Sequence, residues 1–123
     1  MFWQAAPLQV IPDADAGQVV IEVNYRVAPD NEAAFVEAMA DLRRSRLRSG
    51  GFRWELYRTG EDPHEFVEVF ATPSWDEHLR QHEGRLTAAD KAVEDWVAGL
   101  LEEPATSRHL LPPVTLPPDD VEE

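Results

Sequence analysis

Hydrophobic and polar residues alternate, in part, along three short runs of the chain, which is the pattern of β-strands. The runs are VVIEVNYRV (19–27), FRWELYRT (52–59) and EFVEVFAT (65–72), and all are rich in β-branched or aromatic residues. The third run carries apolar groups on both of its faces. Because a strand that is apolar on both sides is covered on both sides, we expect two layers to enclose this part of the sheet.

Between and after these runs, three segments have the marks of helices. The first follows Pro29, and Gly50 and Gly51 end it. SRHLL at 107–111 comes after the last helix and predicts a short fourth strand. The predicted caps are Asp30 or Asn31 for the first helix, Ser74 with Glu77 for the second (WDEHLRQHE), and Thr87 with Asp90 for the third.

The resulting order, β-α-β-β-α-α-β, matches the split βαβ arrangement of the ferredoxin-like plan. We therefore predict an α+β fold in which an antiparallel sheet carries its helices on one face. The other face then needs a cover, and a second copy of the sheet is the most economical one. The sequence thus predicts a homodimer, closed face to face as a dimeric α+β barrel. We place the domain at 18–111, between an N-terminal arm (1–17) and an acidic, proline-rich, disordered tail (112–123).

Charge and cysteine content narrow the classes of function. Twenty-four acidic residues against eleven basic ones give a formal net charge of −13, which opposes binding to nucleic acid or anionic lipid. The chain has no cysteine, so a thiolate nucleophile and a zinc–sulfur site are excluded. No apolar run approaches the roughly 20 residues that span a bilayer, and MFWQAAPLQVIPD lacks the features of a signal peptide. We expect a cytoplasmic protein without membrane insertion.

Three segments resemble a known family: VVIEVNYRVAPDNEAAFVEAMADLRRSR, GGFRWELYRTGEDPHEFVEVFATPSWDEHLRQHEGRLTAADKAV and SRHLL. They are similar to the soluble C-terminal domain of certain bacterial major facilitator superfamily exporters. That domain is itself similar to the antibiotic biosynthesis monooxygenase-like dimeric α+β barrels, which include cofactor-free oxygenases and haem-degrading enzymes. The resemblance implies a cleft between helices and sheet, and it brings no matched catalytic motif. Since the transmembrane half is missing, we expect either a free-standing relative or an excised domain.

His78 and His82 are the candidate catalytic residues, because their i, i+4 spacing places both imidazoles near one face of the second helix. We predict that Trp75, Leu79 and His82 form one stripe, with His78 at its edge. General acid–base chemistry is the sharper interpretation, and ligation of a metal or haem is a lesser one. The simplest interpretation is that one imidazole is packed and the other exposed. The spacing lacks the glutamate of a zinc protease motif.

Large aromatic and polar side chains on the strands and at the start of the second helix are the candidate substrate-binding groups. Core packing explains the aromatic rings most simply, with Trp96 and Tyr57 also turned inward, and a buried arginine would pair with Glu22, Glu55 or Glu68. Together the rings would line a cavity for a flat aromatic ligand. The basic stretch RRSRLR (43–48) is most simply a solvated helix end, and otherwise a docking surface for an anionic partner or the acidic tail. The candidate binding residues are Asn24, Arg53, Trp54, Tyr57 and Trp75.

Two functions from different classes follow. The first is a small-molecule enzyme of secondary metabolism that acts on an aromatic or polyketide-like substrate, as a cofactor-independent monooxygenase. A histidine would remove a substrate proton, and Asn24, Arg53 or Tyr57 would hold the anion before oxygen attacks. The alternative is a non-catalytic ligand-binding or interaction module, related to the soluble domain of the exporters.

Overall fold

The computed structural model describes residues 3–5, 8, 10, 17–83 and 87–113, and for 3–5 and 81–83 it describes the backbone alone. The sheet runs in the order β1-β5-β2-β4-β3, and its four longer strands are antiparallel to their neighbours. β1 joins the β5 edge in a short parallel pairing. The strands are β1 (Trp3–Ala5), β2 (Val19–Arg26), β3 (Phe52–Arg58), β4 (Glu65–Thr72) and β5 (Ala105–Leu110).

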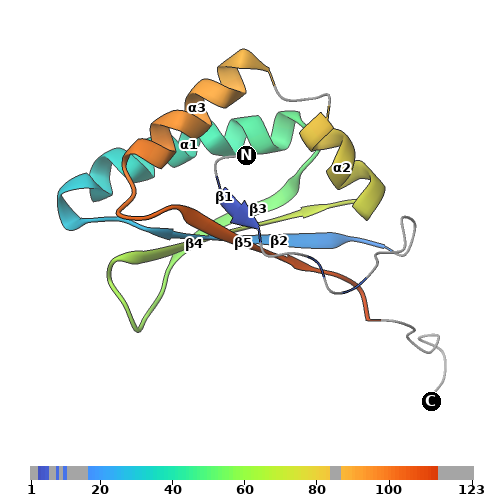
Figure 1. The fold of residues 1–123 in the computed structure, drawn as a ribbon, viewed down its shortest axis with the longest axis horizontal. Helices are drawn as coiled ribbons and strands as arrows, with labels where there is room; N and C mark the ends of the chain where they lie inside the picture. The colour runs from blue at the N-terminus through green and yellow to red at the C-terminus, as the bar shows by residue number, and fades with distance from the viewer. Residues whose placement is uncertain (1–2, 6–7, 9, 11–16, 84–86, 114–123) are drawn as a thin grey trace.

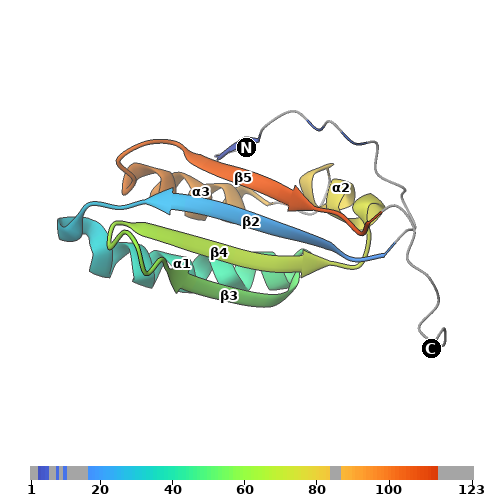
Figure 2. The same cartoon turned by 90° about the horizontal axis from the view of Figure 1, so that it is seen from below.

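The helices lie on one face of the sheet, and Figure 2 shows the strands from the face that the helices leave bare (Figures 1 and 2). The predicted order of elements and the ferredoxin-like α+β fold are therefore confirmed. The helices are η1 (Pro29–Asn31), α1 (Glu32–Arg48), α2 (Trp75–Glu83) and α3 (Ala88–Gly99).

The helix ends follow the predicted caps, with one difference. Thr87 and Asp90 form both halves of a capping box at α3, and Ser74 Oγ accepts from the backbone N–H of Glu77 at 3.1 Å at α2. Asn31 stands at the N-cap position of α1, but its side-chain amide donates to the carbonyl oxygen of Leu100 at 3.3 Å. Asn31 thus ties the start of α1 to the end of α3.

The hydrophobic core lies between the sheet and the helices. β2 alternates strictly between buried and half-buried positions, and Ile21, Val23 and Tyr25 on its helix-facing side are at most 1% exposed. Their neighbours on β2 face the bare side, where Val67 and Val69 of β4 are half-buried. The sheet therefore has one covered face and one that the single chain leaves partly open.

The structure corrects three predictions about which segments lie at the surface. The arm predicted at 1–17 includes a strand, because Trp3–Ala5 pairs with Ala105–Ser107. Trp96, expected inside, is 43% exposed. The stretch 43–48 is not wholly solvated, since Arg46 is only 6% exposed. The tail beyond residue 113 lies outside the described residues.

Along the described ranges (3–5, 8, 10, 17–83 and 87–113), no helix has both the length and the apolar character that crossing a membrane requires.

Candidate functional site

His78 is packed inside the molecule rather than at the edge of an exposed stripe. It is 2% exposed, whereas Leu79, predicted on the inward stripe, is 39% exposed. α2 begins at Trp75, and residues three apart lie on the same helical face, so Trp75 and His78 turn together toward the sheet. The predicted stripe is therefore wrong. The side chain of His82 lies outside the described residues, although its backbone belongs to α2.

The partner of these two rings is His109 on β5, which the sequence prediction missed. The ring centroids are 5.1 Å apart for His78 and His109, 5.4 Å for Trp75 and His78, and 5.5 Å for Trp75 and His109. We call Trp75, His78 and His109 the imidazole–indole cluster. The alternation of β5 was the available signal, because it places Ala105, Ser107 and His109 on one face.

Burial affects the protonation of His109. It lowers the pKa of His109 below the ordinary histidine value of 6.5, because the charged imidazolium loses solvation when it is partly buried. His109 is therefore neutral near pH 7 and can accept a proton. A half-exposed neutral imidazole beside an indole face suits proton abstraction from a flat ligand.

Ser107 lies on the same face of β5, two residues before His109. It is 4% exposed, and its Oγ has no hydrogen-bond partner among the described residues. In the register, Ser107 pairs with Val23 and His109 with Ile21, both of which are fully buried on the helix side. The cluster thus has a hydroxyl as its neighbour along the strand.

The other predicted binding residues do not converge on His78. Asn24 pairs with Val67 and Thr106, on the bare face of the sheet. Tyr57 also pairs with Val67 and is 51% exposed. Arg53 occupies an exposed bulge with φ 54° and donates to Gln18 Oε1 at 3.1 Å. The sheet itself separates Asn24 and Tyr57 from the imidazoles, so these residues cannot act on a ligand held at His78.

Trp54 belongs to a second buried group, centred on Glu68, which is 0% exposed. The indole Nε1 of Trp54 donates to Glu68 Oε2 at 2.7 Å, and the hydroxyl of Tyr25 donates to Glu68 Oε1 at 2.6 Å. Arg46 of α1 donates from Nε to Oε2 at 2.9 Å and from Nη2 to Oε1 at 3.1 Å. We call Tyr25, Arg46, Trp54 and Glu68 the carboxylate network. Glu68 is one of the predicted partners for a buried arginine, and that arginine comes from the helix.

Within the carboxylate network, each ionisable side chain is held in the protonation state that its hydrogen bonds require. Burial, and then the negative charge of Glu68, raise the pKa of Tyr25 well above its usual value, so the phenol stays protonated and donates. Burial alone would lower the pKa of Arg46, but Glu68 raises it above the usual range, so the ion pair stays charged. All four donors satisfy one carboxylate, which indicates a structural role.

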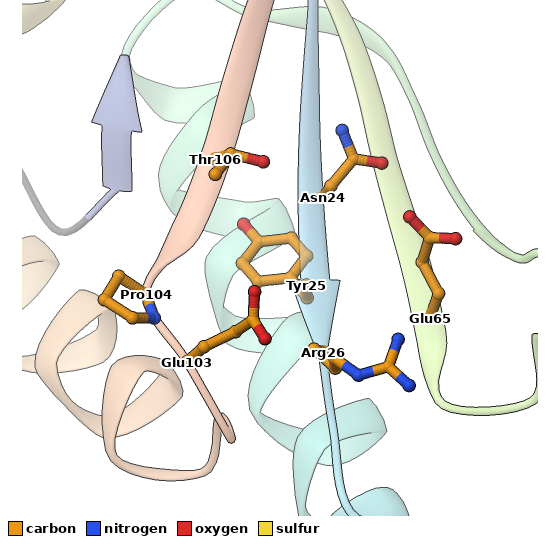
Figure 3. Close-up of a pocket in the computed structure, with 7 residues that line it drawn as sticks. All are labelled: Asn24, Tyr25, Arg26, Glu65, Glu103, Pro104 and Thr106. Carbon is orange, nitrogen blue, oxygen red and sulfur yellow. The ribbon is translucent and has the colours of Figure 1, made fainter. Parts of the chain in front are cut away.

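A small pocket lies elsewhere, at the end of β2 (Figure 3). Its volume is about 120 Å³, and Asn24, Arg26, Glu65, Glu103 and Thr106 are among its lining residues. Arg26 is already engaged, since its Nη1 donates to Asp62 Oδ2 at 2.6 Å. The pocket is therefore polar, and its lining carries the carboxylates of Glu65 and Glu103.

In the part of the chain that the structure describes, no group of three or more histidine, aspartate or glutamate side chains is arranged to hold a metal ion.

Comparison with known proteins gives a family and a fold. The model of a family described as transmembrane secretion effectors matches residues 1–111. No curated protein matches the chain.

Solved structures share the fold at low sequence identity. A Nitrosomonas europaea protein, classed provisionally as an antibiotic biosynthesis monooxygenase, has a TM-score of 0.66 at 23% identity, covering 84% of this chain and 95% of its own. A variant of SnoaB, a cofactor-independent oxygenase from Streptomyces nogalater, has a TM-score of 0.67 at 17% identity, covering 84% and 100%. A Caulobacter crescentus protein with the same provisional class has a TM-score of 0.68 at 16% identity, covering 80% and 92%. These likenesses show the fold alone.

Proposed function

Given that this chain belongs to the transmembrane secretion effector family, we propose that its domain is a small-molecule enzyme that oxygenates an aromatic or polyketide-like substrate without a cofactor. The observation that carries the proposal is the imidazole–indole cluster, in which a neutral His109 lies 5.1 Å from His78 and 5.5 Å from Trp75. SnoaB, which shares the fold, is described as a cofactor-independent oxygenase. Substrates of this kind are products of secondary metabolism.

The proposed reaction needs only a base, an oxygen molecule and a substrate that forms a stable carbanion. His109 removes a proton from a methylene group that adjacent aromatic or carbonyl groups acidify. The carbanion passes one electron to oxygen, and the substrate radical and superoxide combine as a peroxide anion. The peroxide anion takes the proton back from the His109 imidazolium, and the resulting hydroperoxide loses water, so that CH₂ and O₂ become C=O and H₂O. The substrate supplies all the electrons, and no external reductant is consumed.

His78 acts in this scheme as a positioning residue. It is buried behind His109, with its ring centroid 5.1 Å away. Packing against a buried ring restricts the orientations of the catalytic imidazole and so lowers the entropy cost of reaching the substrate. Trp75 offers the ring face on which the substrate stacks.

A homodimer is part of the proposal. The bare face of the sheet carries Val67 and Val69 half-buried, with Tyr57 and Leu110 at 51% and 41% exposed. A second copy would bury these side chains from water. Val69→Lys would then give a monomer in analytical ultracentrifugation, whereas Val36→Lys, at an exposed position of α1, would leave the dimer intact. An unchanged dimer of the Val69→Lys variant contradicts this packing.

The alternative is a non-catalytic binding module that acts with an exporter of the major facilitator superfamily. Two observations favour it: the family match over 1–111, and the separation of Asn24 and Tyr57 from the imidazoles by the sheet. A module would bind an aromatic ligand at the cluster and release it unchanged.

Oxygen uptake with an anthrone or a naphthohydroquinone tests the enzyme. We expect His109→Ala to lower turnover by about 10²- to 10⁴-fold, the usual contribution of a general base. His64→Ala, in the turn before β4, is the matched control and should keep full turnover. Equal turnover of the two variants contradicts the assignment of His109, and ligand binding without oxygen uptake by the unaltered protein favours the module.

A further inference from the structure

The helix-facing side of β5 carries a buried hydroxyl that the described protein groups do not use. Ser107 is 4% exposed, and its Oγ has no hydrogen-bond partner within the described residues. Buried polar groups are nearly always paired, so an exception requires a reason. The buried Ser45 shows the ordinary case, because its Oγ donates to Asp90 Oδ1 at 2.7 Å.

The register fixes where this hydroxyl lies relative to the imidazoles. Ser107 and His109 pair with Val23 and Ile21 on the covered side of the sheet. Residues two apart on a strand project from the same face at points about 7 Å apart. His109 is in ring contact with Trp75 of α2. Ser107 therefore projects from the same face of β5 as His109, whose neutral imidazole contacts the indole of Trp75.

We propose that Ser107 and His109 form the polar end of a binding site for an aromatic ligand that carries a phenolic or enolic oxygen. The inference rests on the proposed function and names the donor that holds the anion, in place of Asn24, Arg53 and Tyr57. The hydroxyl of Ser107 donates to the ligand oxygen, His109 accepts the proton, and the ligand ring lies against Trp75.

The proton transfer balances within the site. The O–H or C–H bond of the ligand breaks, its electron pair stays on the ligand as a phenolate or enolate, and an N–H bond forms on His109. The imidazolium is then the counter-charge of the oxyanion. Because the ligand enters neutral, a protein with a net charge of −13 does not repel it.

Two probes of the same shape test the donor. 4-Nitrophenol ionises and its phenolate absorbs visible light, whereas 4-nitroanisole cannot ionise. We expect Ser107→Ala to weaken binding of the phenolate about tenfold, in line with the loss of one hydrogen bond to a charged oxygen. The ionisation midpoint of bound 4-nitrophenol should rise by about one pH unit, since tenfold in affinity equals one unit. Binding of 4-nitroanisole should stay within twofold.

Two further variants control for folding and position. Ser107→Thr keeps a hydroxyl and should retain the midpoint of the unaltered protein. Thr106→Ala removes a hydroxyl from the opposite, exposed face of the same strand and should change neither probe. If Ser107→Ala weakens both probes equally, or neither, or if the unaltered protein does not bind 4-nitrophenol, the proposal is overturned.

The outcome is separable from that of the proposed function. Binding of nitrophenolate that depends on Ser107, without oxygen uptake from a naphthohydroquinone, supports this site and removes the oxygenase. Oxygen uptake that is equal in the unaltered protein and in Ser107→Ala supports the oxygenase and removes Ser107 as its donor.

Discussion

The carboxylate network and the surroundings of the imidazole–indole cluster differ in how completely their hydrogen bonds are satisfied. In the carboxylate network, Glu68 accepts from Tyr25, Trp54 and Arg46, and the four side chains join α1 to three strands. In the imidazole–indole cluster, rings meet at 5.1–5.5 Å, and the neighbouring hydroxyl of Ser107 has no partner among the described residues. A closed network stabilises the fold, whereas a hydroxyl without a hydrogen-bond partner among the described residues is available to a ligand.

Removal of the central carboxylate should have the largest effect. Glu68→Ala breaks a buried ion pair and leaves Arg46 with the carboxylate of Glu94 at 3.7 Å, and breaking such a pair typically costs about 3–5 kcal/mol. Urea denaturation measures this loss of stability, with Glu37→Ala at an exposed position of α1 as the charge-matched control. The comparison fails if both variants unfold at the same urea concentration. The Arg46→Met/Glu68→Leu double variant should recover part of the loss, because it removes both charges together.

The same substitution at two tryptophans should separate the two groups. Trp54→Phe takes a hydrogen bond from a buried carboxylate and should cost about 2 kcal/mol of unfolding free energy. Its turnover or ligand binding should stay within twofold. Trp75→Phe keeps an apolar ring and should cost less than half as much, but it should weaken ligand binding. Denaturation measures the stability of both variants, and ligand titration measures their binding. If Trp75→Phe loses more stability and Trp54→Phe loses more ligand binding, the assignment of a structural role to Trp54 and a binding role to Trp75 is contradicted.

Two buried serines allow a finer test. Ser45→Ala removes a donor to Asp90 and should cost about 1 kcal/mol. Ser107→Ala removes a hydroxyl that no described group uses, so we expect a change within about 0.5 kcal/mol. Thermal unfolding of the two variants side by side measures the difference. A larger loss at Ser107 than at Ser45 would show that Ser107 has a structural partner.

The smallest expected effect is a pH dependence from His109. Burial lowers its pKa in the folded state below the ordinary value of 6.5, so the unfolded chain binds more protons at low pH. Well above pH 6.5, His109 is neutral in both the folded and the unfolded protein and does not change the free energy of unfolding. As the pH falls from there through the pKa of the folded state, the unfolded chain takes up the proton first, and the folded protein loses stability. His109→Gln should therefore lose less stability than the unaltered protein between pH 7 and pH 5. Parallel curves for the two proteins would contradict this.

The fold was largely predictable from the sequence, because each element has a local signal. The alternation of 19–27, the glycines after α1 and the box of Thr87 with Asp90 all act within a few residues, and the structure keeps them. The candidate site was predictable only in part, since it joins α2 to β5 across the fold. His78 was identified, but the pairing with His109 depends on how α2 packs, which no local pattern states.

Two other residues show the same limit. Arg46 belongs to a basic helix end that reads as solvated, and only the position of Glu68 on β4 explains its burial. Asn24 alternates with Val23 and Tyr25, so the sequence places it on the opposite face from them. The local sequence does not state which face the helices cover. In the assembled fold they cover the face opposite Asn24, so Asn24 and the imidazoles lie on different sides of the sheet.

The pairing of β1 with β5 gives the site a mechanical connection to the start of the chain. Ala5 stands opposite Ser107 in this parallel register, and Trp3 stands opposite Ala105. Tension applied before Trp3, from a tag, a surface or a preceding domain, is transmitted directly to the backbone that carries Ser107 and His109. The strand at the site is thus the strand from which such a load would pull β1 away.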